Sequence, residues 1–381
     1  MTPGRGVKVV VAPDKFRGSL TAREVCTAVE RGVLRVRPAA SVVSVPVADG
    51  STVDAALASG WRAVSLDTSG ANGQPVRATY AIDGDTALVE LAEVCGLAAI
   101  AATDRRPLTA TTYGLGTLIA AALDQGVRRL VLALGGSASI DGEAGMLQAL
   151  GVGLHDEYGR DLPPGGAALT ALASVDLTGL DLRMHDVEVI VASDVDNPLL
   201  GPAGAAACFG PQKGASPGDI EQLESGLRRF SEVLEAGGTR LAVAGAATAP
   251  GAGAAGGTAY GAMVVLGARL EPGIALVLDL VGFPQVLSGA DLVVTGEGSI
   301  DAQTLRGKVP VGVAYAAAQK AVPVVAVAGR CLLAAEDLAA VGIKAVYALL
   351  DIEPDPVRSL TEADRLLEDL AVQLALEQLP A

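Results

Sequence analysis

The sequence lacks several features that would assign a protein quickly to a class. Only 3% of its 381 residues are aromatic, so its core must be built from Ala, Val and Leu. Neither of its two histidines lies near a Gly-x-Ser-x-Gly or His-Glu-x-x-His pattern, which argues against a serine hydrolase and a zinc peptidase. Its four cysteines are far apart with no Cys-x-x-Cys spacing, as is typical of reduced, buried thiols.

Positive charge and long apolar runs are scarce as well. The chain has 28 basic and 43 acidic residues, a net charge of −15 and no basic cluster, so nucleic acid and acidic membrane surfaces are poor partners. No stretch reaches the roughly 18 uninterrupted apolar residues that a spanning helix needs, and residues 1–8 carry no signal-peptide core. We therefore expect a soluble, cytoplasmic protein. The sequence is compatible with a homo-oligomer but does not fix the oligomeric state.

Glycine and β-branched apolar residues are abundant. The 47 glycines show no collagen-like period, and apolar β-branched runs alternate with Ala-rich helical ones, which favours an α/β fold. Both ends of the chain show βαβ organisation, whereas 61–67, 76–82 and 86–91 indicate strands of which the last two form a hairpin at Asp83-Gly84. We predict a parallel, Rossmann- or flavodoxin-like sheet in a domain of residues 1–82 and 290–381. A second α/β domain, residues 83–289, is inserted into it.

Two glycine-rich segments follow strand-like runs. Residues 130–134 lead into Gly135-Gly136-Ser137 and a helix from Ala144, and residues 291–295 lead into Gly296-Glu297-Gly298. Such strand exits gather free backbone N–H groups that can hold an anion, and a phosphate would suit that geometry. Each segment alone is equally typical of an ordinary strand-to-helix turn.

Carboxylates and lysines recur at the strand exits. The sequence contains no Gly-x4-Gly-Lys-Ser/Thr motif and no His-Arg-Asp loop. Phosphoryl transfer needs metal-bridged phosphates, a base near a hydroxyl and cations on developing charge, and side chains of these types are present. Solvated loop charges are the alternative interpretation. The residues are Asp14, Lys15, Asp49, Asp141, Asp194, Glu297, Asp301 and Lys308.

A formal dinucleotide fingerprint also occurs, Gly251-x-Gly253-x-x-Gly256, with Glu271 at the spacing of a ribose-binding acid. Six residues separate its preceding strand candidate, residues 241–244, from the first glycine, whereas the motif requires an immediate strand-to-helix turn. An NAD-dependent dehydrogenase is therefore the weaker alternative.

Seven motifs in chain order resemble the bacterial glycerate kinase family, which includes the glycerate 2-kinases. The resemblance implies ATP and Mg²⁺ as cosubstrates, D-glycerate as the small hydroxy-acid acceptor, 2-phosphoglycerate as the product and a two-domain α/β fold. The motifs are residues 12–20 (APDKFRGSL), 46–50 (PVADG), 135–138 (GGSA), 194–199 (DVDNPL), 209–214 (FGPQKG), 250–257 (PGAGAAGG) and 295–298 (TGEG) continuing to Lys308.

The resemblance and the strand-exit pattern together give each candidate residue an expected role. The ATP phosphates are expected on the two glycine segments and one lysine, Mg²⁺ on two carboxylates, and catalysis on two aspartates and one lysine. The cofactor-binding residues are Gly135, Gly136, Ser137, Gly296, Gly298 and Lys308, the metal ligands Glu297 and Asp301, and the catalytic residues Asp194, Asp49 and Lys15.

The sequence departs from the family pattern at four places. The usual turn Ala-Asp-Gly-Gly-Glu-Gly-Thr is two residues shorter at residues 48–52 and has lost its glutamate. Ile140 stands where the family often has Asn or Thr, Glu143 where it usually has Gly, and Ser299 where Arg is common. A kinase for a different small 2-hydroxy acid, a catalytically impaired homologue and a binding or regulatory homologue therefore stay open.

Overall fold

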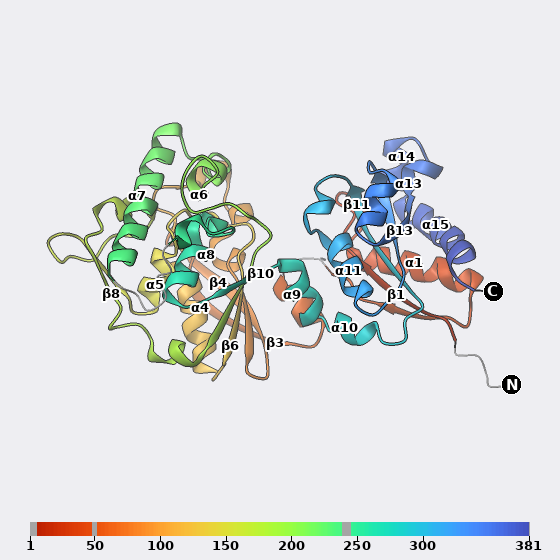
Figure 1. The fold of residues 1–381 in the computed structure, drawn as a ribbon, viewed down its shortest axis with the longest axis horizontal. Coiled ribbons are helices and arrows are strands. Elements are labelled where there is room, and N and C mark those ends of the chain that lie inside the picture. Colours follow the sequence, from red (N-terminus) through yellow and green to blue (C-terminus); the bar gives the residue numbers. More distant parts are fainter. Residues whose placement is uncertain (1–5, 48–51, 238–244, 381) are drawn as a thin grey trace. The chain divides into compact units, whose positions relative to one another are not determined.

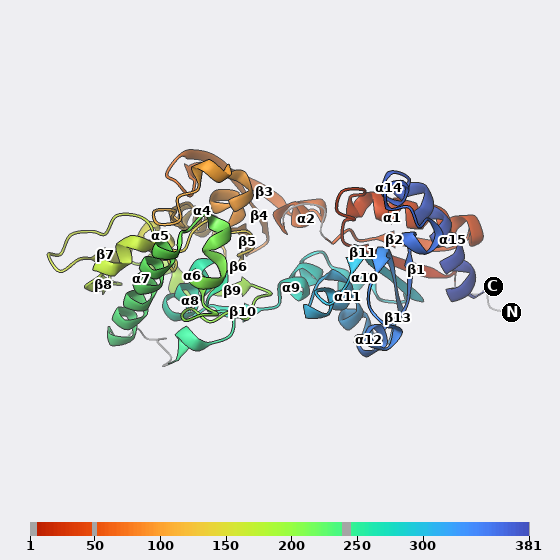
Figure 2. The same ribbon diagram turned by 90° about the horizontal axis from the view of Figure 1, so that it is seen from above.

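A computed structural model describes residues 6–47, 52–237 and 245–380. The chain forms two compact units: unit 1 comprises residues 1–59 and 274–381, and unit 2 comprises residues 60–273. These bounds differ from the predicted divisions at 82/83 and 289/290. The elements of both units are drawn in Figures 1 and 2.

Unit 1 is built on a five-stranded parallel sheet with the order β13-β12-β11-β1-β2. Counted within the unit, this is the order 2-1-3-4-5 of flavodoxin-like folds, so the predicted fold class is confirmed. Its strands are β1 (Lys8–Pro13), β2 (Ser41–Ser44), β11 (Leu292–Ile300), β12 (Val324–Cys331) and β13 (Ile343–Ala348). Its helices are α1 (Ala22–Val36), α2 (Thr52–Ala58), α9 (Gly273–Leu280), α10 (Phe283–Val286), α11 (Val309–Ala318), α12 (Ala335–Ala340), α13 (Leu349–Ile352), α14 (Pro356–Thr361) and α15 (Ala363–Gln378).

Strand β1 has a continuous apolar run because both of its faces are buried. Val9 and Val11 join the core formed with α1 and α15, whereas Val10 and Ala12 join the core formed with α11. Successive side chains of a strand point to opposite faces, so a strand covered on both sides needs apolar residues at every position.

Unit 2 contains a mixed six-stranded sheet with the order β10-β9-β6-β5-β4-β3. Strands β5, β6, β9 and β10 are parallel, whereas β3, β4 and β5 pair antiparallel. The strands of the six-stranded sheet are β3 (Arg62–Ser69), β4 (Pro75–Asp83), β5 (Thr86–Glu90), β6 (Arg129–Ala133), β9 (Glu188–Ala192) and β10 (Arg269–Glu271). Strands β7 (Gly153–His155) and β8 (Ser174–Asp176) form a separate antiparallel pair. Its helices are α3 (Ala92–Cys95), α4 (Tyr113–Asp124), α5 (Ala144–Ala149), α6 (Ala205–Phe209), α7 (Pro217–Ala236) and α8 (Ala254–Val265).

The predicted hairpin at Asp83-Gly84 is confirmed, and it accounts for the different unit boundary. Strand β4 pairs with β5 through Asp83 and Thr86, and β3 pairs with β4 along its whole length. Because hydrogen-bonded strands fold together, β3 and β4 belong with the inserted unit.

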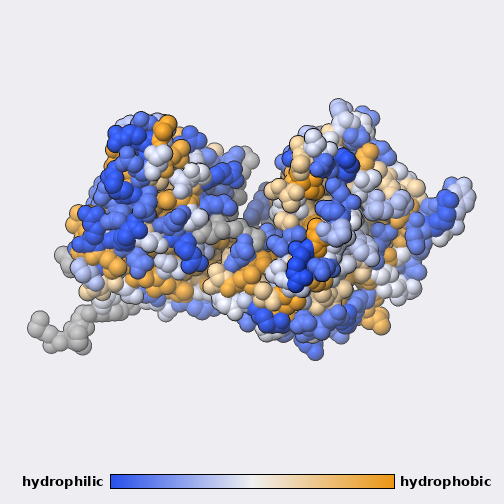
Figure 3. All heavy atoms as spheres, turned by 180° about the vertical axis from the view of Figure 1, so that it is seen from behind, coloured by the Kyte–Doolittle hydropathy of each residue, from blue (hydrophilic) through white to orange (hydrophobic). Residues whose placement is uncertain are grey.

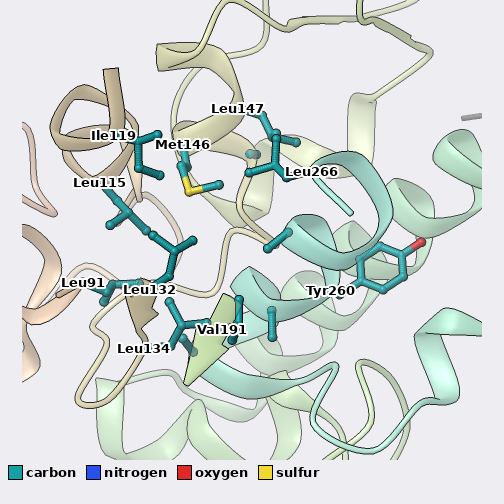
Figure 4. Close-up of a cluster of buried hydrophobic side chains, with 14 of the residues drawn as sticks. Leu91, Leu115, Ile119, Leu132, Leu134, Met146, Leu147, Val191, Tyr260 and Leu266 are labelled. Carbon is teal, nitrogen blue, oxygen red and sulfur yellow. The ribbon is translucent and has the colours of Figure 1, made fainter. Parts of the chain in front are cut away.

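The main core of unit 2 holds the exit of β6 in place. Figure 4 shows Leu132 and Leu134 from this strand and its exit among side chains of α4, α5 and α8. Leu115 and Met146, from α4 and α5, are fully buried there. Close packing against these helices limits the movement of the segment that follows the strand.

Among the described helices, none combines the length and apolar character needed to cross a membrane. On the face drawn in Figure 3, hydrophobic residues are interspersed with hydrophilic ones.

Candidate functional site

A cavity of about 610 Å³, the unit 1 cavity, lies at the carboxyl ends of β1, β11 and β12. The chain continues from β1 to β2 on one side, whereas β11 to β13 lie on the other, so this is the topological switch point where open α/β sheets bind ligands. Its lining includes five predicted site residues, the strand-exit candidate Asp14 and further residues that the sequence had not assigned to a site. They are Lys15, Glu297, Gly298, Asp301 and Lys308 together with Asp14, Phe16, Arg17, Ser19, Ser299, Gln303, Gly329, Arg330, Leu349, Leu350, Pro356, Ser359 and Leu360.

Glu297 is the most buried carboxylate of the unit 1 cavity. Its Oε1 accepts a hydrogen bond from the Thr304 hydroxyl, and its Oε2 lies 3.3 Å from Lys308 Nζ. Burial raises the pKa of Glu297, while Thr304 and Lys308 oppose that rise. Burial also raises the pKa of Asp14, against the hydrogen bond from the Lys15 amide. Thr304 Oγ1 additionally accepts from the Asp301 amide at 3.0 Å, which ties Asp301 to Glu297.

The carboxylates of this cavity suit a magnesium ion that is shared with a substrate. Within the described ranges, no group of three or more His, Cys, Asp or Glu side chains could hold a metal by itself. Mg²⁺ in phosphoryl-transfer sites is usually bound through one or two carboxylates, with substrate phosphates and water completing the octahedron. Glu297 and Asp301 meet that requirement, although they do not make a complete protein-only site.

The prediction of a turn at Gly296–Gly298 is wrong. These residues lie inside β11, where Gly296 pairs with Val327 of β12 and Glu297 with Ala328. A Cβ on Gly296 would lie 2.3 Å from the Val327 carbonyl oxygen, and one on Gly298 would lie 3.2 Å from the Arg17 amide nitrogen. The glycines are therefore required for close approach of neighbouring backbone and do not form an open cradle of free amides.

A second cavity of about 360 Å³, the unit 2 cavity, lies where β6 and β9 end. Here the predicted glycine turn is present: β6 ends at Ala133, and Gly136 has a φ of 71°, which favours glycine. The amides of Gly135, Gly136 and Ser137 donate to no group in the described part of the chain. The lining is Leu97, Leu134, Gly135, Gly136, Ser137, Ala192, Ser193, Asp194, Val195, Phe209, Gln212, Lys213, Ala254 and Ala255.

Lys213 is a residue of the unit 2 cavity to which the sequence had assigned no role. Its side chain is only 2% exposed, and Nζ donates to Ser137 Oγ and to the Ser139 carbonyl, both at 2.6 Å. Burial lowers the pKa of Lys213 to about 8, against the effects of Cys95 and Asp141. In the sequence, the one indication of a role for Lys213 was its place between two glycines in the motif at residues 209–214. Only the tertiary structure shows that its ammonium contacts Ser137 of the glycine turn, 76 residues earlier in the chain.

Asp194 is the one acidic residue of its segment that reaches the unit 2 cavity. It follows β9, is exposed, and accepts a hydrogen bond from the Gly273 amide at 2.8 Å through Oδ1. Asp196 does not line the cavity, and Asn197 donates to the Ala203 carbonyl. Of Asp194, Asp196 and Asn197, Asp194 alone is positioned to meet a ligand there.

Asp141 is a structural carboxylate behind the glycine turn. It is wholly buried and accepts from the amide and hydroxyl of Thr112, both at 2.8 Å, and from the Gly145 amide at 3.2 Å. Burial raises the pKa of Asp141, and these hydrogen bonds oppose the rise. Its contacts join the start of α4 to the start of α5.

Glu143 occupies an unfavourable position. It is fully buried with a φ of 81°, and in the described structure neither carboxylate oxygen has a hydrogen-bond partner. Burial and the neighbouring Asp141 raise the pKa of Glu143 well above 4.5. Gly261 of α8 has no room for a side chain, since a Cβ there would lie 2.1 Å from Glu143 Oε2.

We expect Glu143→Gly to stabilise the protein by about 1–2 kcal/mol at pH 7. Relief of the left-handed conformation is worth about 1 kcal/mol and removal of an unpaired buried carboxyl about 1–3 kcal/mol, less the lost packing and the flexibility of glycine. Because the folded-state pKa is raised, the carboxyl costs most at high pH, so the gain should shrink towards pH 4.5. Urea denaturation at both pH values measures the gain. Glu143→Gln is the control, which keeps the bulk but removes the carboxyl titration; an unchanged or lower stability of Glu143→Gly at pH 7 would contradict the prediction.

The glycines of the dinucleotide-like motif pack against two loops: Gly251 and Gly253 against the loop after β9, and Gly256 against the loop after β6. Positive φ values continue through Ala255, Gly256 and Gly257 at the start of α8, and a Cβ on Gly256 would lie 2.2 Å from the Ser139 carbonyl oxygen. A short 3₁₀ segment, Ala246–Thr248, precedes the motif in place of an adjoining strand. The strand candidate at residues 241–244 lies outside the described residues.

The predicted site residues thus fall into two groups. Unit 1 brings together Lys15, Glu297, Gly298, Asp301 and Lys308 around its cavity, and Gly296 lies beneath them in β11 without lining it. Unit 2 brings together Gly135, Gly136, Ser137 and Asp194. Asp49 lies outside the described residues.

Comparisons with known proteins all point to one family, and the matches cover almost the whole chain. The model of the glycerate kinase family matches residues 9–377. Glycerate kinase from Bacillus subtilis (strain 168) is 44% identical over 92% of this chain and 91% of its own length, and glycerate 2-kinase from Escherichia coli (strain K12) is 42% identical over 90% and 91%. A crystal structure of a protein assigned as glycerate kinase 2 from Salmonella typhimurium LT2 superposes with a TM-score of 0.83 at 39% identity, covering 98% of both chains.

Proposed function

The chain belongs to the glycerate kinase family, and from this premise we propose that it transfers the γ-phosphoryl group of ATP to D-glycerate, giving 2-phosphoglycerate and ADP. The proposal rests on the lining of the unit 2 cavity. There, free amides of a glycine turn, a lysine ammonium and one exposed carboxylate line the same space. Amides and a cation suit an anionic substrate, and a carboxylate suits proton removal from a hydroxyl.

Asp194 is the proposed general base. Its Oδ1 is held by the Gly273 amide, which leaves Oδ2 for the proton of the acceptor hydroxyl. Deprotonation makes that oxygen a better nucleophile as the bond to phosphorus forms and the bond to the ADP oxygen breaks. Lys15 is proposed to neutralise charge that develops on the phosphates. Asp49 keeps its proposed catalytic role from the sequence.

Glu297 and Asp301 are the proposed magnesium ligands, and Lys308 is the proposed contact to the phosphates. When bound, the ion would neutralise phosphate charge and fix the geometry of the triphosphate. The sequence assigns Gly135, Gly136 and Ser137 to the phosphates of ATP, and their free amides would bind anionic oxygens of the substrate that occupies the unit 2 cavity. Gly296 and Gly298 would contribute by their small size, because their backbone belongs to β11.

The proposed function predicts ADP release that depends on D-glycerate and on Mg²⁺. The assay compares D-glycerate, L-glycerate, glycolate and tartronate, and phosphorus NMR identifies the product. We expect D-glycerate to give the highest kcat/KM and a 2-phosphate, and chelation of divalent cations to abolish turnover until Mg²⁺ is added back. A 3-phosphate would overturn the regiochemistry, and no turnover with any acceptor would overturn the kinase proposal.

Replacing Glu297 by Gln should raise the Mg²⁺ concentration needed for half-maximal activity by about tenfold. The substitution removes one ligand charge while keeping the side-chain volume, and ligand charge sets affinity for hard cations. A Mg²⁺ titration at saturating ATP and glycerate measures the effect. Glu336→Gln, at an exposed position of unit 1 that does not line the cavity, controls for the loss of one negative charge. An unshifted titration of Glu297→Gln would remove this residue from the metal site.

A different small 2-hydroxy acid is the second candidate acceptor. The observation in its favour is the short turn at residues 48–52, which lacks the glutamate of the family pattern. The assay across the four acids decides between the two candidates. A catalytically impaired homologue would bind ADP but turn over none of the four acids. Membership of a kinase family leaves the dehydrogenase alternative without support.

A further inference from the structure

We propose that the two substrates bind to different units: the nucleotide occupies the unit 1 cavity, and the hydroxy acid occupies the unit 2 cavity with its carboxylate on Lys213. This inference rests on the proposed function and adds to it the division of the ligands and the roles of Lys213, Arg330 and Leu360.

The unit 1 cavity has the volume and the mixed lining that a nucleotide requires. Ligand cavities for molecules of that size are typically about 300–1,000 Å³, mostly apolar, with a few placed polar groups. At about 610 Å³ this cavity is the larger of the two. One part of its wall is apolar and suits a base, namely Phe16, Leu349, Leu350, Pro356 and Leu360.

The remaining wall of the unit 1 cavity is suited to a triphosphate. Four basic side chains line it against three acidic ones, in a protein whose net charge is −15. The local excess of positive charge is therefore unusual for this chain. A bound Mg²⁺ would increase it further. The basic residues are Lys15, Arg17, Lys308 and Arg330, and the acidic residues are Asp14, Glu297 and Asp301.

Arg330 and Leu360 reach this cavity from different elements. Arg330 follows the apolar part of β12, is exposed, and donates from Nε to Ser299 Oγ at 2.9 Å, which leaves its other guanidinium N–H groups for an anion. Leu360 lies on α14 and is 52% exposed, although leucine side chains are usually buried. A base stacked on this wall would cover that apolar surface.

The unit 2 cavity is matched to a small monoanion. Its basic lining residue is Lys213, whose buried ammonium spends two of its three hydrogens on Ser137 and Ser139. Among the described residues no acceptor is found for the third hydrogen, so a ligand carboxylate can take it. A buried charge is stabilised when it is paired, and one carboxylate supplies one opposite charge. With the carboxylate on Lys213, Asp194 in the same lining is available to the hydroxyl.

The titration of Lys213 supplies a readout that a purely structural lysine would not give. Its pKa of about 8 means that the ammonium loses its proton just above neutral pH. Cys95 of α3 and the carboxyl of Asp141, which follows β6, face the same ammonium, and burial raises the pKa of both groups. Asp194 lines the same cavity. We expect the KM for the acceptor to rise as pH passes about 8, while the Kd for ADP stays constant.

The test uses the full chain. Calorimetry measures ADP binding, and steady-state kinetics measure the KM for ATP and the KM for the acceptor. In unit 1, Arg330→Gln and Leu360→Asp should each weaken ADP binding about tenfold or more and leave the acceptor KM within about twofold. Val357→Asp is the matched control, because Val357 lies on the same helix, is 67% exposed and does not line the cavity. It should change neither quantity.

In unit 2, Lys213→Met should raise the acceptor KM at least about tenfold, abolish its dependence on pH near 8 and leave ADP binding unchanged. Circular dichroism and urea denaturation of the full chain show whether the variant is folded. Should Lys213→Met fail to fold, Ser137→Ala replaces it, with an expected rise of the acceptor KM of about threefold and unchanged ADP binding.

Two patterns would overturn the division of ligands. One is ADP affinity unchanged in both Arg330→Gln and Leu360→Asp; the other is ADP affinity lost in the unit 2 variant with an unchanged acceptor KM. Because ADP binding needs no turnover, it separates this inference from the proposed function. A chain that binds ADP through Leu360 but phosphorylates none of the acids retains the nucleotide assignment and loses the kinase proposal.

Discussion

Asp194→Asn is expected to lower kcat by about 100-fold or more, with a much smaller effect on the KM for ATP. General-base assistance typically contributes a factor of about 10²–10⁴, and the amide cannot accept the proton of the acceptor hydroxyl. The substitution preserves the volume of the side chain and its acceptor oxygen for the Gly273 amide, so the local structure should persist. Single-turnover kinetics at saturating ATP and glycerate measure the chemical step directly.

Asp196→Asn provides the matched control for this experiment. Asp196 is exposed, lies two residues further along the same loop and does not line the unit 2 cavity. We expect its kcat to stay within about twofold of the wild-type value. Turnover near the wild-type rate in Asp194→Asn would show that another group accepts the proton, or that substrate-assisted transfer needs no protein base.

Asp141→Ala is expected to lower the free energy of unfolding by about 3–5 kcal/mol. The substitution leaves three buried donors without their acceptor, namely the amide and hydroxyl of Thr112 and the amide of Gly145. Losing one partner of a buried charged network typically costs that much. The Thr112 hydroxyl also accepts from the Met146 amide at 3.0 Å, so the loss reaches the start of α5. Urea denaturation followed by circular dichroism measures it.

Two further variants show whether burial sets the size of this effect. Asp141→Asn keeps one acceptor oxygen and should cost less, about 1–3 kcal/mol. Asp67→Ala breaks an exposed ion pair with Arg77 at 3.2 Å and should change the unfolding free energy by no more than about 1 kcal/mol, because water screens that pair. Equal losses for Asp141→Ala and Asp67→Ala would contradict the structural role of Asp141.

Sequence periodicity was sufficient for the sheet of unit 1 and for the glycine turn after β6. Strand β1 is apolar at every buried position because it is covered on both faces, and this pattern is local in the chain. The capping box Thr21–Glu24 at the start of α1 and the Asp83-Gly84 hairpin are also local features, and both are present. The motifs that resemble glycerate kinases are local as well, and they were enough to identify the family.

Tertiary structure decided what local patterns could not. Gly296–Gly298 resembled a turn, but pairing with β12 extends β11 through them, and strand pairing depends on residues about 30 positions away. The boundary of unit 2 follows from the pairing of β4 with β5, and the role proposed for Lys213 follows from its contact with Ser137. Glu143 was recognised as a departure from the family pattern, but its burial and positive φ were visible only in the folded chain.

The sequence by itself determined local backbone preference and which faces are apolar, because neighbours in the chain set both. The tertiary structure determined which polar groups share a cavity and which are buried without a hydrogen-bond partner, because burial and hydrogen bonding depend on residues that are distant in sequence.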